Sequence, residues 1–153
     1  MGIGMDKINE LINGLFDSDD KAAYLCLKEL ESLSEYGSQV YQFFDTFADM
    51  LRNDNSYIRT RGLRLISANA KWDIDFKIDE IIDEYLCHIM DDKPITARQC
   101  IRVLPNIARY KPNLVDDIYS ALNKANPGRY TDSMQQLISG DIVLALKMIN
   151  KMT

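Results

Sequence analysis

The sequence contains few of the residues that interrupt or crosslink a polypeptide chain. Its 153 residues include only four prolines and seven glycines, which leaves no room for a flexible linker or a low-complexity segment. Cys26, Cys87 and Cys100 are an odd set without paired spacing, so they predict a reducing compartment rather than a disulfide framework. His88 is the single histidine, and a mechanism that depends on histidine therefore has one candidate base.

Long apolar runs are also missing. No stretch approaches the roughly 20 apolar residues that cross a bilayer, and the opening residues, MGIGMDKIN, contain no apolar signal core. The net charge of −5 predicts repulsion from nucleic acid and from anionic membranes. These absences indicate a single soluble, cytoplasmic domain over residues 1–153 with no membrane partner, and a monomer is the expected state.

What the sequence does contain is apolar residues at helical spacing of three and four throughout, without the alternation of a strand. The start signals expected for helices are Ser38, Asn55 and Asp75 as N-caps, and Pro94 and Pro112 in first turns. The sequence therefore predicts an all-α fold of about eight helices. They run near 6–16, 19–35, 38–52, 55–72, 76–91, 94–110, 112–125 and 130–151.

Two of these helices repeat each other at a constant offset in the numbering. Leu63 corresponds to Ile101 and Arg64 to Arg102, and the helices that precede them keep the same offset. Helix pairs that recur at one period are typical of a solenoid, in which each pair buries its apolar face against its neighbours. We predict an N-terminal cap pair over 1–35 and repeat pairs over 38–72, 75–111 and 112–151.

The stretch LRNDNSYIRTRGLRLISANA resembles a HEAT repeat. Asp54 stands at the turn between helices, Ile58 and Arg59 form the aliphatic–Arg pair, and small and aliphatic residues follow; the second copy keeps Asp92. The resemblance covers roughly 38–111 and extends to a group of small bacterial cytosolic proteins with HEAT-like repeats, some of them labelled SufBD. It implies an α-α superhelix of about four helix pairs, with Arg59 bonded to the turn and the second helix of each pair lining the concave side.

No motif predicts catalysis or a cofactor. Cys87 and His88 are adjacent, and adjacent residues of a helix point about 100° apart, which is unsuitable for a shared tetrahedral metal site. Cys26 and Cys100 lie in apolar stretches, where thiols act as small hydrophobes. The acidic residues Asp79, Glu80, Asp83 and Glu84 are interpreted as a solvated outer helix face, although paired carboxylates also suit acid–base work or a hard cation.

The charge pattern predicts a binding face on the second helices. Segments 55–72 and 94–110 contain several cations and no acid, whereas 75–92 is strongly acidic. On a helical projection Ile58, Gly62 and Leu65 share the core arc, and a polar arc lies opposite. The candidate binding residues on the polar arcs of the two helices are Tyr57, Arg61, Arg64, Lys71, Arg98, Arg102, Asn106 and Arg109.

These residues favour a non-enzymatic module that binds an acidic protein or peptide segment, because the planar guanidinium group can hold a carboxylate through two hydrogen bonds. Arg64 and Arg102, at equivalent repeat positions, are expected to lie side by side. Three alternatives remain open at this stage. The cations could pair with internal carboxylates, the protein could bind nucleic acid as the HEAT-like alkylpurine DNA glycosylases do, or it could be a purely structural scaffold.

Overall fold

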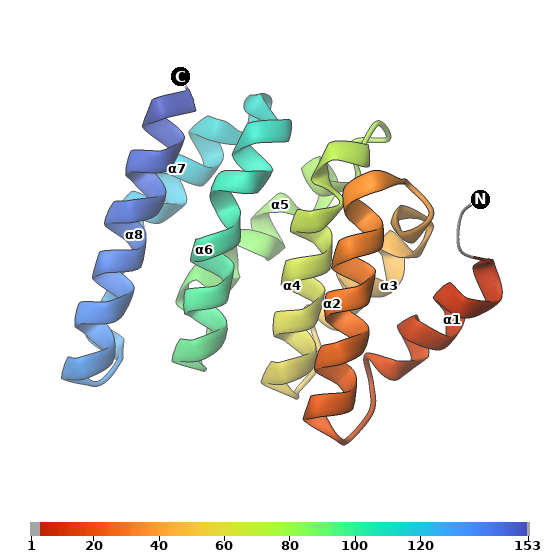
Figure 1. The fold of residues 1–153 in the computed structure, drawn as a ribbon. Coiled ribbons are helices and arrows are strands. Elements are labelled where there is room, and N and C mark those ends of the chain that lie inside the picture. The colour runs from red at the N-terminus through yellow and green to blue at the C-terminus, as the bar shows by residue number, and fades with distance from the viewer. Residues whose placement is uncertain (1–3, 153) are drawn as a thin grey trace. The chain divides into compact units, whose positions relative to one another are not determined.

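The computed structural model describes residues 4–152 as helices joined by short turns (Figure 1). The α-helices are α1 (Met5–Gly14), α2 (Asp20–Tyr36), α3 (Phe44–Met50), α4 (Ser56–Ala68), α5 (Lys77–Cys87), α6 (Pro94–Tyr110), α7 (Val115–Lys124) and α8 (Asp132–Met152). Residues 4–152 contain no strand, so the all-α prediction is confirmed. Residues 1–3 of the predicted cap pair, and residue 153, lie outside this described range. None of the described helices is both long enough and apolar enough to cross a membrane.

Several predicted helices are divided into an α-helix and a short 3-10 helix. The 3-10 segments are η1 (Val40–Phe43), η2 (Ala70–Trp72), η3 (His88–Met90), η4 (Pro112–Leu114) and η5 (Pro127–Arg129). At the end of α4 the cause is Asn69, whose backbone leaves the helical region at φ −102° and ψ 7°. The buried Asn69 amide donates to the Leu65 carbonyl at 2.9 Å, which satisfies a carbonyl of the last turn.

The helix starts agree only in part with the predicted caps. Asn55 caps α4 by accepting a hydrogen bond from the Tyr57 N–H at 2.8 Å, as predicted. The caps predicted at Ser38 and Asp75 are wrong, because η1 and α5 have no side-chain cap. The residue before α5 is Phe76, which enters the helix from the left-handed region at φ 59°. This geometry depends on the local chain path and has no sequence signal at a phenylalanine.

The chain divides into two compact units, residues 1–74 and 75–153. In the first unit α2 packs against α1 and α4, and α3 packs against α4. Fully buried side chains, among them Leu27, Leu30, Phe44, Phe47, Leu63 and Leu65, form the core. Gly62 belongs to this contact, because the Phe47 carbonyl lies only 2.8 Å from where a Cβ atom would stand.

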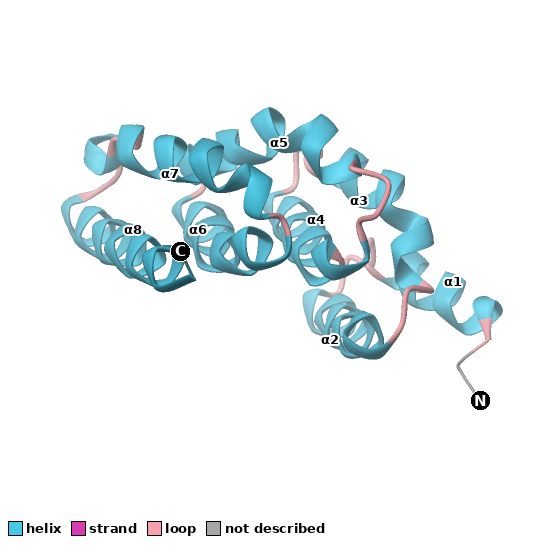
Figure 2. Ribbon diagram, turned by 90° about the horizontal axis from the view of Figure 1, so that it is seen from above, coloured by secondary structure: helices cyan, strands magenta, loops and turns pink. Residues whose placement is uncertain are grey.

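In the second unit α6 and α8 lie side by side in one layer, and α5 and α7 form the other layer (Figure 2). The core contains the fully buried residues Tyr85, Cys100, Ile101, Leu104, Ile118 and Ile138. Pro105 lies inside α6 and is buried. Burying each large apolar side chain contributes about 1.5–3 kcal/mol, so these layers are the main source of stability.

The turn before the second helix of a repeat has the same geometry in both units. In the first unit the Asn53 side chain accepts from the Asn55 N–H at 2.8 Å, and the Asp91 side chain accepts from the Lys93 N–H at 2.9 Å in the second. Asn53 and Asp91 are separated by the same offset as Leu63 and Ile101, and so are Asn55 and Lys93. The repeat read from the sequence therefore corresponds to a repeated Asx turn.

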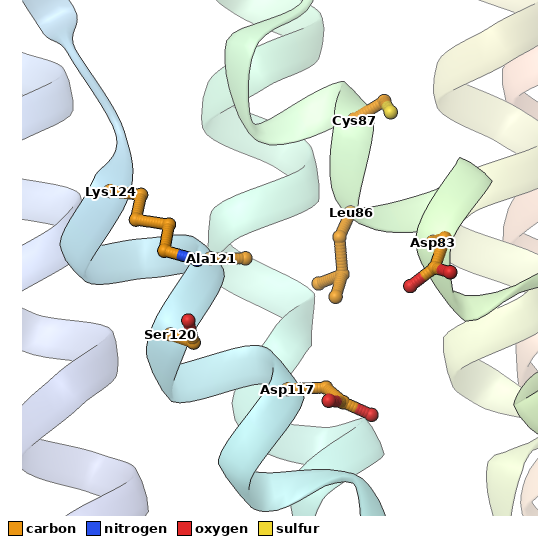
Figure 3. A pocket seen from close by; sticks show the side chains of 7 residues that line it. All are labelled: Asp83, Leu86, Cys87, Asp117, Ser120, Ala121 and Lys124. Atoms are coloured by element: carbon orange, nitrogen blue, oxygen red, sulfur yellow. The ribbon is translucent and has the colours of Figure 1, made fainter.

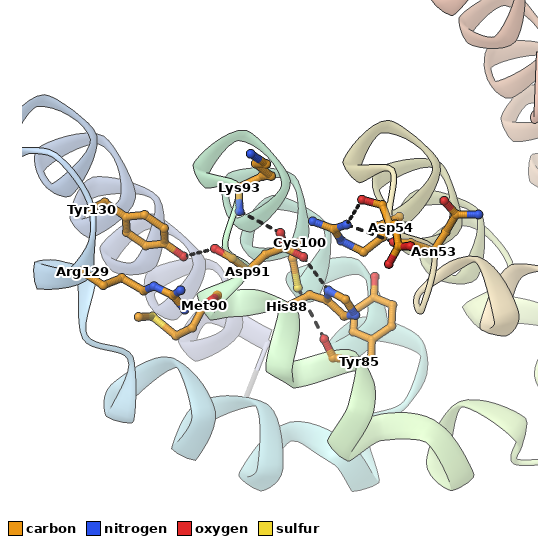
Figure 4. Close-up of polar contacts among 11 residues, drawn as sticks. Asn53, Asp54, Tyr85, His88, Met90, Asp91, Lys93, Cys100, Arg129 and Tyr130 are labelled. Atoms are coloured by element: carbon orange, nitrogen blue, oxygen red, sulfur yellow. Dashed lines mark hydrogen bonds and ion pairs between the residues drawn. The ribbon is translucent and has the colours of Figure 1, made fainter. Parts of the chain in front are cut away.

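The two turns differ in what holds their carbonyl groups. Arg59 donates to the Asn53 and Asp54 carbonyl oxygens, both at 3.0 Å, which confirms the predicted role of Arg59. Position 97 of the second copy is an alanine. There the hydroxyl of Tyr130, at the end of η5, donates to the Asp91 carbonyl instead (Figure 4). A residue from the following helix pair thus replaces the missing arginine.

Candidate functional site

The predicted binding residues are distributed over both units. Tyr57, Arg61 and Arg64 belong to α4 and Lys71 to η2 of the first unit, whereas Arg98, Arg102, Asn106 and Arg109 belong to α6 of the second. The expected proximity of Arg64 and Arg102 concerns both units and remains a prediction.

Arg61 does not lie at the surface, so its predicted exposure is wrong. The residue is 5% exposed, and its Nη1 donates to the Leu15 carbonyl at 2.9 Å. Its Nη2 pairs with Asp20 Oδ1 at 3.2 Å. Leu15 follows α1 and Asp20 begins α2, so Arg61 ties the α1–α2 connection to α4. A guanidinium group with these bonds is a structural element of the first unit.

Arg64 is also engaged internally. Its Nε and Nη2 donate to the two carboxylate oxygens of Glu31 on α2, at 3.0 and 2.8 Å. Its guanidinium group lies 5.8 Å from the centre of the Tyr24 ring. The arc of α4 that was predicted to be exposed is therefore covered by α2. A helical projection cannot reveal this second neighbour, because it separates apolar from polar sides but does not say which polar side meets another helix.

The other two candidates of the first unit lie nearer the surface. Tyr57 is exposed, and Lys71 Nζ donates to the Glu35 carbonyl at 3.1 Å. Between α2 and α4 there is a recess of about 190 Å³. Its lining combines tyrosines with internally bonded arginines, namely Asp20, Tyr24, Leu27, Tyr57, Thr60, Arg61 and Arg64. With both arginines already neutralised, this recess offers no clear charge preference for a ligand.

In the second unit Arg98 and Asp141 form an ion pair between α6 and α8. Arg98 Nε donates to Asp141 Oδ2 at 2.7 Å, and the side chains are 19% and 10% exposed. The hydrogen bond to Asp141 raises the pKa of the Arg98 guanidinium group, more than burial lowers it. The predicted exposure of Arg98 is therefore wrong, because a carboxylate of the neighbouring helix holds it.

Arg102, unlike Arg98, is exposed and forms no hydrogen bond to Asp141. Its side chain is 52% exposed, and its Nε lies 3.7 Å from Asp141 Oδ1, beyond hydrogen-bond distance. Because Asp141 already bonds Arg98, one carboxylate faces two guanidinium groups and a positive charge remains. Arg109 is exposed with its guanidinium group 5.3 Å from the centre of the Tyr110 ring, and Asn106 is half-buried. Among residues 4–152, neither Arg102 nor Arg109 forms a hydrogen bond to a carboxylate.

A row of exposed apolar side chains on α8 lies beside these arginines, and sequence analysis missed it. It consists of Leu137, Leu144, Met148 and Met152, which are 43%, 58%, 44% and 44% exposed. Their spacing of seven, four and four residues places them on one side of the helix. Leu144 and Met148 join Arg102 and Pro105 around a recess of about 50 Å³. We call this surface the α6–α8 face: Arg98, Arg102, Pro105 and Arg109 with Leu137, Asp141, Leu144, Met148 and Met152.

A signal for the apolar row is present in the sequence. Helix α8 carries a second apolar stripe, Ile138, Ile142, Ala145 and Ile149, and this stripe is the buried one. Only one apolar side of α8 packs against the rest of its unit. The second apolar side is therefore available for another contact.

A further recess of about 350 Å³ lies between α5 and α7 in the second unit (Figure 3). Its lining residues are Asp83, Leu86, Cys87, Asp117, Ser120, Ala121 and Lys124. Asp83 belongs to the acidic face predicted on α5, but Asp79 of that face is bonded to Lys111 at 2.7 Å and to Asn113 at 2.5 Å. Asp79 is therefore an internal anchor rather than a solvated carboxylate.

The sulfur and imidazole groups have structural surroundings. Cys100 is fully buried and donates to the Tyr85 carbonyl at 3.8 Å, and burial raises the pKa of its thiol. Burial and the nearby carboxylates of Glu29 and Asp17 raise the pKa of the Cys26 thiol. A raised pKa keeps a thiol protonated and weakly nucleophilic at neutral pH.

His88 lies between α5 and η3, and its Nδ1 is 2.8 Å from Asp91 Oδ2 (Figure 4). Asp91 also accepts from the Lys93 N–H and is almost fully buried. The imidazole thus belongs to the network that holds this turn. Within residues 4–152, no three side chains of the metal-binding types come together.

The fold and these surfaces define an all-α protein built from successive helix pairs. No family model and no curated protein matches the sequence. Two crystal structures of engineered proteins from the Northeast Structural Genomics Consortium are similar to it, each with 16% sequence identity. The first has a TM-score of 0.58 over 95% of this chain and 68% of its own, and the second has 0.59 over 94% and 37%. The chain spans well under half the length of the second protein, and similarity at this identity shows the fold alone.

Proposed function

We propose that the protein is a non-enzymatic, HEAT-like interaction module, and that the α6–α8 face binds an acidic segment of another protein. The observation that carries this proposal is the excess positive charge around Asp141. Arg98 uses that carboxylate at 2.7 Å, while Arg102 stays exposed and 3.7 Å away from it. A carboxylate supplied by a partner would give Arg102 the charge-assisted hydrogen bonds that Asp141 cannot provide.

Arg109 supports the same chemistry. It is exposed on α6, on the same helical arc as Arg98 and Arg102, and its guanidinium group lies 5.3 Å from the centre of the Tyr110 ring. The second cation extends the positive strip along α6, so a segment with more than one acidic residue is favoured over a single carboxylate.

Ion pairs within the protein reduce the number of arginines that can bind a partner. Arg61, Arg64 and Arg98 hold the helices together, and the proposed contacts to a partner are therefore made by Arg102 and Arg109. The net charge of −5 repels nucleic acid more strongly than a short acidic segment, because nucleic acid carries a dense row of phosphates. Cys26, Cys87 and Cys100 are free thiols, which is consistent with the reducing, cytosolic setting that we include in the proposal.

The test is a titration followed by ¹⁵N-labelled nuclear magnetic resonance, which detects weak binding residue by residue. The probes are two blocked peptides of about 15 residues, one of Glu and Ala and the other with Lys at every Glu position. We expect the Glu peptide to shift the Arg102 and Arg109 side-chain signals and the amides of α6, with an affinity that falls as salt rises. The Lys peptide should leave these signals in place.

The matched variants are Arg102→Glu and Arg52→Glu. Arg52 is exposed on the first unit beside Asp49, in a surface ion pair that contributes little stability. Arg102→Glu should abolish the shifts, and Arg52→Glu should leave them unchanged. Equal binding of the Glu and Lys peptides, or unaltered binding by Arg102→Glu, would refute the proposal.

A further inference from the structure

We infer that the acidic segment is an amphipathic helix, whose apolar side rests on the α8 row while its carboxylates meet Arg102 and Arg109. This inference rests on the proposed function. It adds that the partner segment has an apolar side as well as an acidic one. Its starting point is the side-by-side arrangement of two different surfaces on one face. Arg102 and Pro105 on α6, with Leu144 and Met148 on α8, surround the same recess.

The length and spacing of the row fit a helix. The stretch of α8 from Leu137 to Met152 corresponds to about 22 Å at the rise of an α-helix. Leu144 and Met148 lie between them, so the row extends over about four turns, with Asp141 between Leu137 and Leu144. A helical partner presents apolar side chains at intervals of three and four residues and can follow this row along its length. Methionine side chains, which adapt their shape, suit such a contact.

The charges on the face decide between a foreign segment and a second copy of this chain. In a two-fold symmetric dimer the same patch meets itself. Such a dimer through the α6–α8 face would bring the exposed Arg102 and Arg109 side chains toward identical cations, and the carboxylate of the face, Asp141, already bonds Arg98. An acidic helix covers the apolar row and neutralises the arginines at the same time. Charge complementarity therefore selects an acidic amphipathic partner.

The recess at Pro105 provides an anchor point. At about 50 Å³ it is smaller than a large side chain, so it takes the end of one apolar side chain rather than a whole ring. Leu144 is the most exposed member of the row, and its position at this recess makes it the centre of the contact. Central, well-packed apolar positions contribute most of the binding free energy at protein interfaces.

The test uses the Glu/Ala peptide and an amphipathic version with Leu at every third or fourth position on one side and the same number of Glu residues. Fluorescence anisotropy of the labelled peptides measures both affinities. We expect the amphipathic peptide to bind about tenfold more tightly or better, a difference of about 1.4 kcal/mol. Circular dichroism should show its helix content rising on binding.

Two variants separate the apolar contribution from the charge contribution. Leu144→Ser with Met148→Ser should remove the advantage of the amphipathic peptide and leave the Glu/Ala peptide unaffected. Val143→Ser is the matched control, because Val143 is similarly exposed on α8 but lies about 100° around the helix from Leu144. It should not change either affinity. Arg102→Glu should weaken both acidic peptides.

The failures of the two proposals are distinguishable. If the Glu/Ala and amphipathic peptides bind equally, or if the serine variants bind like the unaltered protein, the amphipathic partner is refuted while the acidic partner stands. If Arg102→Glu changes neither affinity, the proposed function fails as well. Sedimentation equilibrium tests whether a second copy of this chain covers the α8 row. A dimer that Leu144→Ser dissociates would show that a second copy covers the row and would overturn the inference.

Discussion

Lys111 forms an ion pair with Asp79 at 2.7 Å, and these two residues are the repeat equivalents of Asp73 and Tyr41. Tyr41 donates its hydroxyl to Asp73 at 2.6 Å. In both units, therefore, the start of a first helix is joined to the end of the second helix of its pair. Donor and acceptor are exchanged, because the carboxylate stands at the later position in the first unit and at the earlier position in the second. The repeat keeps the contact while the residues that make it differ.

The Asp79–Lys111 pair predicts a pH-dependent stability. Burial raises the pKa of Asp79, but hydrogen bonds from Lys111 and Asn113 outweigh it, and the net pKa lies below the usual value. Asp79 therefore stabilises the fold above its unfolded pKa of about 4, and this contribution disappears as pH falls through the lowered folded pKa. Asp79→Asn should reduce the free energy of unfolding at pH 7 by about 2 kcal/mol, because it leaves the buried Lys111 without its ion-pair partner Asp79.

Urea denaturation at neutral pH and again in strong acid measures this effect. Asp83→Asn, an exposed position on the same helix, should change the free energy of unfolding by less than about 0.5 kcal/mol at either pH. The loss of unfolding free energy caused by Asp79→Asn should shrink in acid. There the Asp79 carboxyl of the unaltered protein is protonated and, like asparagine, carries no charge. A difference that is independent of pH would contradict the assignment of the lowered pKa.

Replacing the buried Arg61 should cost much more unfolding free energy than replacing the exposed Arg102. Arg61→Leu removes hydrogen bonds to Leu15 and Asp20 and should cost about 2 kcal/mol of unfolding free energy. Arg102→Leu should have an effect below about 0.5 kcal/mol, because Arg102 is exposed and lies beyond hydrogen-bond distance of Asp141. Thermal and urea unfolding of both variants give the comparison. Equal losses would mean that Arg102 is structural and not available to a partner.

Replacing two helical glycines, Gly140 and Gly62, with alanine should have opposite effects on stability. Helix propensity alone favours alanine over glycine by about 1 kcal/mol. At Gly140 a Cβ atom would meet nothing within 4 Å, so Gly140→Ala should stabilise the protein by up to that amount. At Gly62 the Cβ atom would stand 2.8 Å from the Phe47 carbonyl and 2.9 Å from Met50 Cβ. Gly62→Ala should therefore destabilise the protein, because α3 and α4 must move apart.

The melting temperatures of the two alanine variants test the close packing of α3 on α4. Gly140→Ala serves as the control, because it isolates the gain expected from helix propensity. If Gly62→Ala stabilises the protein as Gly140→Ala does, the close approach at Gly62 is refuted.

The three cysteines should react with a thiol reagent in the order of their exposure. Cys87 is exposed, Cys26 is half-buried and Cys100 is buried, and the pKa values of the Cys26 and Cys100 thiols are raised. Iodoacetamide should modify Cys87 first and Cys100 only after the second unit unfolds. Mass spectrometry of proteolytic fragments gives the rate at each cysteine. Rapid modification of Cys100 in the folded protein would contradict its burial.

The sequence by itself determined the elements and the repeat. Apolar spacing of three and four is satisfied by helices, so the α-helices of the described range were all predicted. The Asx turns at Asn53 and Asp91 keep the offset of the two similar helices, but the structure revealed them. These features depend on residues close together in the chain. The resemblance to a HEAT repeat implied the role of Arg59, and its partners Asn53 and Asp54 are also local, at six and five residues away.

Only the tertiary structure decided which polar side of a helix meets water. Arg61 and Arg64 share the polar arc of α4, yet that arc faces α2, where Asp20 and Glu31 bond them. Arg98 is similarly bonded to Asp141 on a distant segment, while Arg102, one turn further along α6, remains exposed. An arginine occupies the same kind of position in the helical pattern whether the carboxylate that it binds belongs to the protein or to a partner. Long-range helix packing sets the distance to that carboxylate, and periodicity contains no information about it.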